Sequence, residues 1–335
     1  MKKILAMLIS FAICFSLTVC FAGCAPKEDE NQNITMTEKE ASKVFTFYIE
    51  NDYVVIDSYF GEKKELVIPA KIVIENKEYE VAVIGEMSLD NGDITKVTIP
   101  STVVTIEKYA FWTCDRLQTV VIADNSKLKT IEERAFEQCG YLETISFGAN
   151  SVLEDIGEHA FEKCESLKSI QIPANVKSIS DYTFSYCTSL KTVGFANNSK
   201  LEEIGGRAFS YCYALESISI PDNVWLVYNY AFSMCTSLKS VTFGQNSAIR
   251  EIGDGVFGGC TALASIIIPN GVEFLHYSVF YGCTDTNVFC EAESKPLGWH
   301  HNWYDGTKGV YWYSPDQPTQ AGNYWRYVNG IPTKW

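Results

Sequence analysis

Eight cysteines, from Cys114 to Cys283, recur along the chain at intervals of 23 or 25 residues. Each follows a phenylalanine by three residues, and seven of them precede a leucine by three residues. The unit reads I-x-x-x-A-F-x-x-C-x-x-L-x-x-V-x-I and is often followed by proline. Such a fixed period predicts a solenoid, because one coil cannot bury its apolar face alone and stacked neighbours build a continuous core.

Within each unit, the residues after the leucine alternate between inward apolar and outward side chains, the period-2 pattern of a strand. In "TVVI" at 119–122, Val120 and Ile122 are predicted to point inward. Segments such as "VKSI" predict a second short strand, and the A-F-x-x-C stretch predicts a short helical or 3₁₀ turn. Proline, asparagine and glycine in "IPAN" and "FGANSVL" reverse the chain.

The repeated unit resembles the BspA-like leucine-rich repeat of bacterial surface proteins, over about residues 54–293. The resemblance implies an α/β fold, a leucine-rich-repeat solenoid of stacked 23–25-residue coils with parallel strands and β-rich caps at both ends. It also implies an adhesin or binding protein, and it names no particular partner.

The segments outside the repeat divide the chain further. Residues 1–23 join two lysines to an apolar run, the pattern of an export signal. The run ends in "FAGC", which resembles the bacterial lipobox, so this resemblance implies lipidation of Cys24; an ordinary cleaved signal is the alternative. Residues 24–43 are polar and predict a flexible tether. An N-terminal β cap is expected at 44–83, the solenoid at 84–293 and an aromatic C-terminal cap at 294–335.

The net charge of −14 disfavours nucleic acid as a partner, because an acidic surface repels phosphate groups. No later apolar run is long enough to span a bilayer, so contact with a membrane is expected only through the lipid anchor. The prediction is a monomer on the outer face of a bacterial membrane that binds an extracellular protein or a polysaccharide.

Stacked coils place the repeated cysteines in one column, about 5 Å apart. Three roles are open for this column: buried free thiols beside the phenylalanines, a disulfide ladder, or a metal site. A straight column offers no tetrahedral cage, and a small buried apolar residue is the favoured interpretation.

The outward strand positions form a face that is rich in hydroxyl groups and nearly uncharged. A partner-binding role is predicted for Thr119, Thr144, Ser146, Ser169, Gln171, Thr192, Ser217, Ser219, Ser240 and Thr242. The alternative is that these short side chains only cover a solvated sheet. Charges beside this face, such as Glu143 with Lys168 and Glu216 with Lys239, are predicted to pair between neighbouring coils.

The residues before the Ala-Phe position form another column, in which arginine and tyrosine are expected to stack. Its members are Tyr109, Arg134, His159, Tyr182, Arg207 and Tyr230. This column is either a recognition surface or an exposed stacked edge.

The C-terminal segment holds five of the seven tryptophans, and Asn329-Gly330 predicts a hairpin turn. One interpretation is an aromatic lid on the last coil. The other is glycan or cell-wall binding through Trp299, Trp303, Trp312 and Trp325, because exposed indoles stack on sugars.

No nucleophile elbow, phosphate loop, zinc-protease or dinucleotide motif occurs in the sequence. No convergent set of titratable groups is expected on the strand face, so neither an enzyme nor a cofactor nor a metal is predicted. Two functions remain: a non-enzymatic cell-surface adhesion protein that binds other proteins, and a glycan-binding module.

Overall fold

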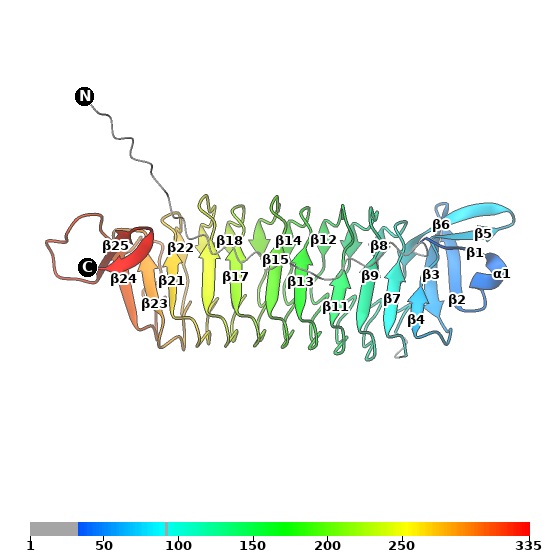
Figure 1. The fold of residues 1–335 in the computed structure, drawn as a ribbon, viewed down its shortest axis with the longest axis horizontal. Helices are drawn as coiled ribbons and strands as arrows, with labels where there is room; N and C mark the ends of the chain where they lie inside the picture. Colours follow the sequence, from blue (N-terminus) through cyan, green and yellow to red (C-terminus); the bar gives the residue numbers. More distant parts are fainter. Residues whose placement is uncertain (1–32, 91–92) are drawn as a thin grey trace, which may run out of the picture.

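The computed structural model describes residues 33–90 and 93–335. Figure 1 shows an elongated stack of coils, with long strands on one face and short strands on the other. The predicted signal peptide and Cys24 lie outside the described residues. The one helix of the described part, α1 (Glu38–Ala41), has four residues, and no helix there is long and apolar enough to cross a membrane.

The long strands stack in parallel along one face of the solenoid (Figure 1). They are β4 (Glu65–Val67), β7 (Lys96–Ile99), β9 (Thr119–Ile122), β11 (Thr144–Ser146), β13 (Ser169–Ile172), β15 (Thr192–Phe195), β17 (Ser217–Ile220), β19 (Ser240–Phe243), β21 (Ser265–Ile268) and β23 (Asn287–Cys290). The pairing register joins equivalent residues of successive coils, such as Thr119 with Thr144 and Ser217 with Ser240. The predicted parallel solenoid is confirmed.

The opposite face carries short parallel strands of two residues each. They are β8 (Thr105–Ile106), β10 (Thr130–Ile131), β12 (Asp155–Ile156), β14 (Ser178–Ile179), β16 (Glu203–Ile204), β18 (Leu226–Val227), β20 (Glu251–Ile252) and β22 (Phe274–Leu275). Each places an aliphatic side chain in the interior, such as Ile131 and Ile179, which are fully buried, and both side chains of β18 are buried. The second strand predicted at "VKSI" is therefore confirmed.

The A-F-x-x-C stretch is a series of tight turns, so the expected short helix or 3₁₀ segment is wrong. Alternate N–H groups bond in different directions: those of Ala110 and Cys114 donate to the carbonyl three residues earlier, whereas that of Phe111 donates to Ala135 of the next coil. Tyr109 and Thr113 have positive φ angles of 58° and 54°. A helix satisfies its N–H groups internally, whereas these turns use half of them to hold the next coil.

A ladder of phenylalanine rings runs through the interior. Successive rings lie 4.6–5.8 Å apart between centroids, with interplanar angles of 1–16°. The rings belong to Phe111, Phe136, Phe161, Phe184, Phe209, Phe232, Phe257 and Phe280, and each is at most 1% exposed. Because each coil adds one ring to the ladder, burial of aromatic area depends on both neighbouring coils.

The repeated cysteines are buried free thiols, so the structure shows the first of the three roles open to them. Each Sγ also donates to a backbone carbonyl of the preceding coil, at 2.8–3.3 Å. From Cys139 onward this carbonyl belongs to the phenylalanine of that coil, as in Cys139 to Phe111. The column therefore links coils as well as filling space.

The N-terminal end is closed by β1 (Thr35–Thr37), α1, β2 (Phe45–Glu50), β3 (Tyr53–Tyr59), β5 (Lys71–Ile74) and β6 (Lys77–Ile84). The expected tether at 24–43 is wrong over residues 35–41, because β1 pairs with β5 and α1 follows it. Thr37 and Glu40 form a capping box, with Glu40 N donating to Thr37 Oγ1 at 3.3 Å. This local signal stabilises a polar segment that composition alone assigns to a linker.

The C-terminal end continues the long-strand face with β24 (Gly309–Tyr313), β25 (Tyr324–Val328) and β26 (Ile331–Lys334). β24 pairs in parallel with β23, and β25 with β26 form an antiparallel hairpin. Asn329 and Gly330, at φ 51° and 77°, make the turn between them, as predicted.

Candidate interaction surfaces

The outward strand positions predicted to bind a partner lie in two straight columns on the long-strand face. The first column holds Thr119, Thr144, Ser169, Thr192, Ser217 and Ser240; the second holds Ser146, Gln171, Ser219 and Thr242. All are exposed or half-buried. Thr144 Oγ1 lies 3.5 Å from Thr119 Oγ1, so hydroxyl groups of adjacent coils approach hydrogen-bonding distance. The side chains of both columns are short, apart from Gln171.

Charged residues beside this face pair between coils, as expected. Lys168 Nζ lies 2.5 Å from Glu143 Oε2, and Glu216 lies 3.1 Å from Lys191 and 3.7 Å from Lys239. Lys191 and then Lys239 lower the pKa of the Glu216 carboxyl. These side chains are 42–67% exposed, so solvent screens each pair and its contribution to the stability of the fold is small. They help to keep the coils in register and leave the hydroxyl face neutral.

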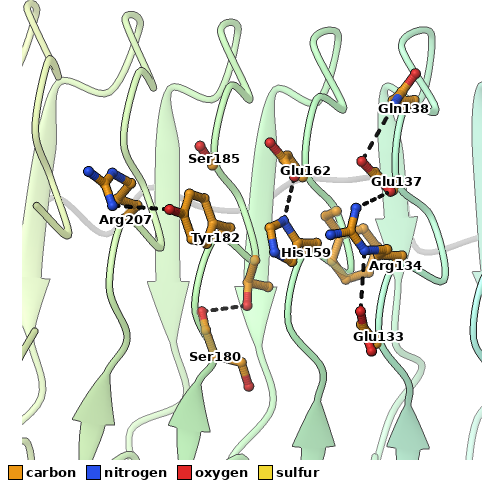
Figure 2. Close-up of polar contacts among 12 residues, drawn as sticks. Glu133, Arg134, Glu137, Gln138, His159, Glu162, Ser180, Tyr182, Ser185 and Arg207 are labelled. Carbon is orange, nitrogen blue, oxygen red and sulfur yellow. Dashed lines mark hydrogen bonds and ion pairs between the residues drawn. The ribbon is translucent and has the colours of Figure 1, made fainter.

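The A-F-x-x-C turns of successive coils form one edge of the solenoid, which we call the turn edge. The column that runs from Tyr109 to Tyr230 lies on this edge. His159 stacks on Tyr182 with ring centroids 4.6 Å apart. Arg207 lies 5.6 Å from the Tyr182 ring and 4.7 Å from the Tyr230 ring, and its Nη1 donates to Tyr182 Oη at 3.0 Å (Figure 2). The predicted cation–π stacking between coils is confirmed at Arg207. Arg134 pairs instead with Glu133 and Glu137.

Two glutamates on the turn edge were not singled out by the sequence analysis. Arg134 Nη1 donates to Glu137 Oε2 at 2.9 Å, and His159 Nδ1 lies 2.5 Å from Glu162 Oε2 (Figure 2). Both carboxylates are nearly buried, at 4% and 9% exposure. The signal for them is the i, i+3 spacing in "RAFE" and "HAFE". In these two coils the turn edge is closed by hydrogen bonds between its own side chains.

The tryptophans proposed to bind a glycan lie mostly in the interior. Trp299, Trp303 and Trp325 are 3%, 1% and 0% exposed, and Trp312 packs half-buried against the same core. Trp299 Nε1 donates to the Val272 carbonyl at 3.0 Å. Burial leaves Trp299, Trp303 and Trp325 no free ring face for a sugar, so the glycan-binding interpretation is wrong for these three and the aromatic lid describes them.

The repeat and its outer faces agree with one protein family. A family model described as a BspA type leucine rich repeat region, in six copies, matches residues 70–164 and 154–287. The matches cover more than half of the chain. The chain belongs to this family. The BspA-type repeat thus accounts for the phenylalanine and cysteine columns and for both strand faces, and the resemblance seen in the sequence is confirmed.

Several solved leucine-rich-repeat structures are similar to this BspA-type chain. A leucine rich cell surface protein of Faecalibacterium prausnitzii is 25% identical, over 80% of this chain and 92% of that one, with a TM-score of 0.45. The leucine-rich-repeat protein of T. pallidum is 25% identical over 66% and 89%, with a TM-score of 0.46. One from Bacteroides ovatus is 23% identical over 80% and 93%, with a TM-score of 0.30. Among curated proteins, none matches.

Proposed function

We propose that the protein is a non-enzymatic adhesion protein of the bacterial cell surface that binds an extracellular protein, from the host or from bacteria, across its long-strand face. One observation carries this proposal: two columns of mostly hydroxyl-bearing side chains form a neutral face on a chain of net charge −14. The serine and threonine hydroxyls of this sheet can donate and accept hydrogen bonds, so they suit a partner whose surface is polar. Each such hydrogen bond contributes about 1 kcal/mol to binding.

The neighbouring charges support a contact on this face. Because Glu143, Lys168 and Glu216 are already paired, a partner would not have to neutralise them on binding. Lipidation of Cys24 belongs to the same proposal, since an anchor at the chain start would leave the solenoid free to reach outward. Replacement of Cys24 by serine is expected to abolish incorporation of labelled palmitate and release the protein from the membrane.

The experiment introduces bulky charge at two neighbouring positions of the first column, on β17 and β19. Ser217→Arg with Ser240→Arg is expected to abolish capture of the partner from extracellular matrix and bacterial surface proteins, with an unchanged circular dichroism spectrum. Ser178→Arg with Thr130→Arg places the same charges on the short-strand face and is the matched control. Equal capture by both double variants, or no reproducible capture by the unchanged protein, would contradict the proposal.

A further inference from the structure

The turn edge is hollowed near its C-terminal end. A groove of about 670 Å³ crosses the turns of four successive coils, beginning at Arg207 and ending at Gly282. Its rim carries Tyr230, Tyr277 and Tyr281, which are 38%, 51% and 69% exposed. This groove belongs neither to the long-strand face nor to the C-terminal cap.

Glycines create this hollow where earlier coils carry large side chains. Gly255 occupies the position of His159 and Tyr182, and Gly259 and Gly282 occupy that of Tyr186. A Cβ at Gly255 would lie 2.6 Å from the Tyr230 ring, and one at Gly259 would lie 2.5 Å from Met234 Sδ. The side chains of Tyr230 and Met234, on the preceding coil, therefore pack directly against these glycines.

The groove is lined by aromatic rings and hydroxyl groups. The available hydroxyls come from Ser233, Thr236, Thr261 and Ser278. Ser210 also lines the groove, but it is 1% exposed and its hydroxyl already bonds to Ser185 and to Arg207 O. Arg207 is the one charged residue among the lining residues, and its guanidinium already lies between two tyrosine rings and bonds to Tyr182. The lining contains no carboxylate, although the chain has 41 acidic residues. The groove is therefore suited to a neutral ligand.

The backbone of the groove is not available to a peptide strand. Gly255 N donates to Tyr277 O at 3.0 Å, and Gly259 N donates to Tyr281 O at 2.7 Å. An extended peptide binds by adding backbone hydrogen bonds to a free edge, and these N–H groups are already used between coils. Recognition must come from ring faces and hydroxyl groups.

We propose that this groove binds a short neutral oligosaccharide. A pyranose ring has an apolar C–H face that stacks on an aromatic ring and equatorial hydroxyls that bond to serine and threonine, the two kinds of group present here. Coils spaced about 4.8 Å apart place the outer lining coils about 15 Å from each other. That span fits a chain of a few sugars better than a single one.

The test titrates the protein with neutral glucose, galactose and mannose tetrasaccharides by calorimetry, and maps contacts by saturation-transfer NMR. At least one tetrasaccharide is expected to bind, with saturation at its ring C–H protons. Tyr281→Ala is expected to weaken this binding about three- to tenfold, the loss of one aromatic stacking contact. Tyr141→Ala removes a tyrosine of 63% exposure outside the groove and is the matched control.

A second variant fills the groove. Gly282→Tyr introduces the residue that the equivalent positions 186 and 211 carry at similar positive φ, and its Cβ would have no heavy-atom neighbour closer than 3.8 Å. It is expected to abolish binding while the protein stays folded.

Absence of binding by all neutral tetrasaccharides would overturn the proposal. Equal loss in Tyr281→Ala and Tyr141→Ala, or tighter binding of a sulfated tetrasaccharide or of a tetrapeptide library, would do the same. The Ser217→Arg and Ser240→Arg variant should bind the sugar normally, so the two proposals fail independently.

Discussion

The hydrogen bonds to one carbonyl oxygen, that of Phe111, show why cysteine recurs in every complete coil. Phe111 O accepts the Cys114 N–H of its own coil at 3.2 Å and the Cys139 S–H of the next coil at 3.1 Å. A buried carbonyl oxygen has two lone pairs, and the thiol donates to the second one. A serine could donate too, but its hydroxyl would be more costly to bury than a thiol. Alanine would lack the donor, and valine would lack it too.

Burial of these thiols predicts instability at alkaline pH. It raises the pKa of Cys283 to about 11 and that of Cys235 to about 12, from 9.0. The unfolded chain therefore loses these protons first, so stability is full below about pH 9 and falls as the pH rises through 9 to 12. Between pH 9 and its own folded-state pKa, each thiol lowers the unfolding free energy by about 1.4 kcal/mol per pH unit.

Urea unfolding at intervals between pH 7.5 and 11 measures this slope. The Cys235→Ala variant is less stable at every pH, because it leaves a cavity, but it should have a shallower slope between pH 9 and 11. A slope identical to that of the unchanged protein would show that the thiol does not contribute to the alkaline loss.

At the scale of the element, the A-F-x-x-C turn depends on left-handed backbone at two residues of each coil. In six of the eight coils with a repeated cysteine, neither of these residues is glycine. The left-handed region costs a residue with a Cβ about 1–2 kcal/mol, and the hydrogen bonds to both neighbouring coils hold it there. Thr113, with φ 54°, is β-branched and the most strained type among them.

Thr113→Asn is therefore expected to stabilise the protein by about 1 kcal/mol, because asparagine tolerates positive φ and keeps a similar unfolded-state entropy. The midpoint of urea unfolding measures the change. Thr236→Asn, at a residue without positive φ, is the control and should change the midpoint little. A Thr113→Asn variant no more stable than the Thr236→Asn variant would indicate that the turn holds no such strain.

The repeat made the strands and core predictable, because the apolar alternation seen at Val120 and Ile122 recurs in every coil. It did not predict the turn, since Tyr109 and Thr113 give no local signal for positive φ. The groove was missed because its volume depends on absent side chains: "GVFGGC" at 255–260 breaks three columns at once, which shows only when the coils are aligned. Composition leaves both a lid and a sugar site open to the indoles, because it does not report burial.

At the scale of the molecule, every coil is stabilised by its two neighbours, so the two ends require covers. At the C-terminal end, Trp303 packs edge-on against Phe280 with centroids 6.1 Å apart, and Trp325 Nε1 donates to Cys290 O at 2.9 Å. β24 also pairs with β23. The cap thus covers both an apolar core and a strand edge.

Removal of residues 294–335 is expected to expose that core and the unpaired edge of β23, and to cause self-association. Light scattering after size exclusion should show oligomers, and the unfolding temperature should fall.

Trp303→Ala separates the two effects, because it removes a core ring, at a cost of about 3–5 kcal/mol, but keeps β24 paired. This variant should be less stable yet monomeric. A truncated chain that remains monomeric with an unchanged unfolding temperature would show that the last coil needs no cover, and that the indoles are buried for another reason.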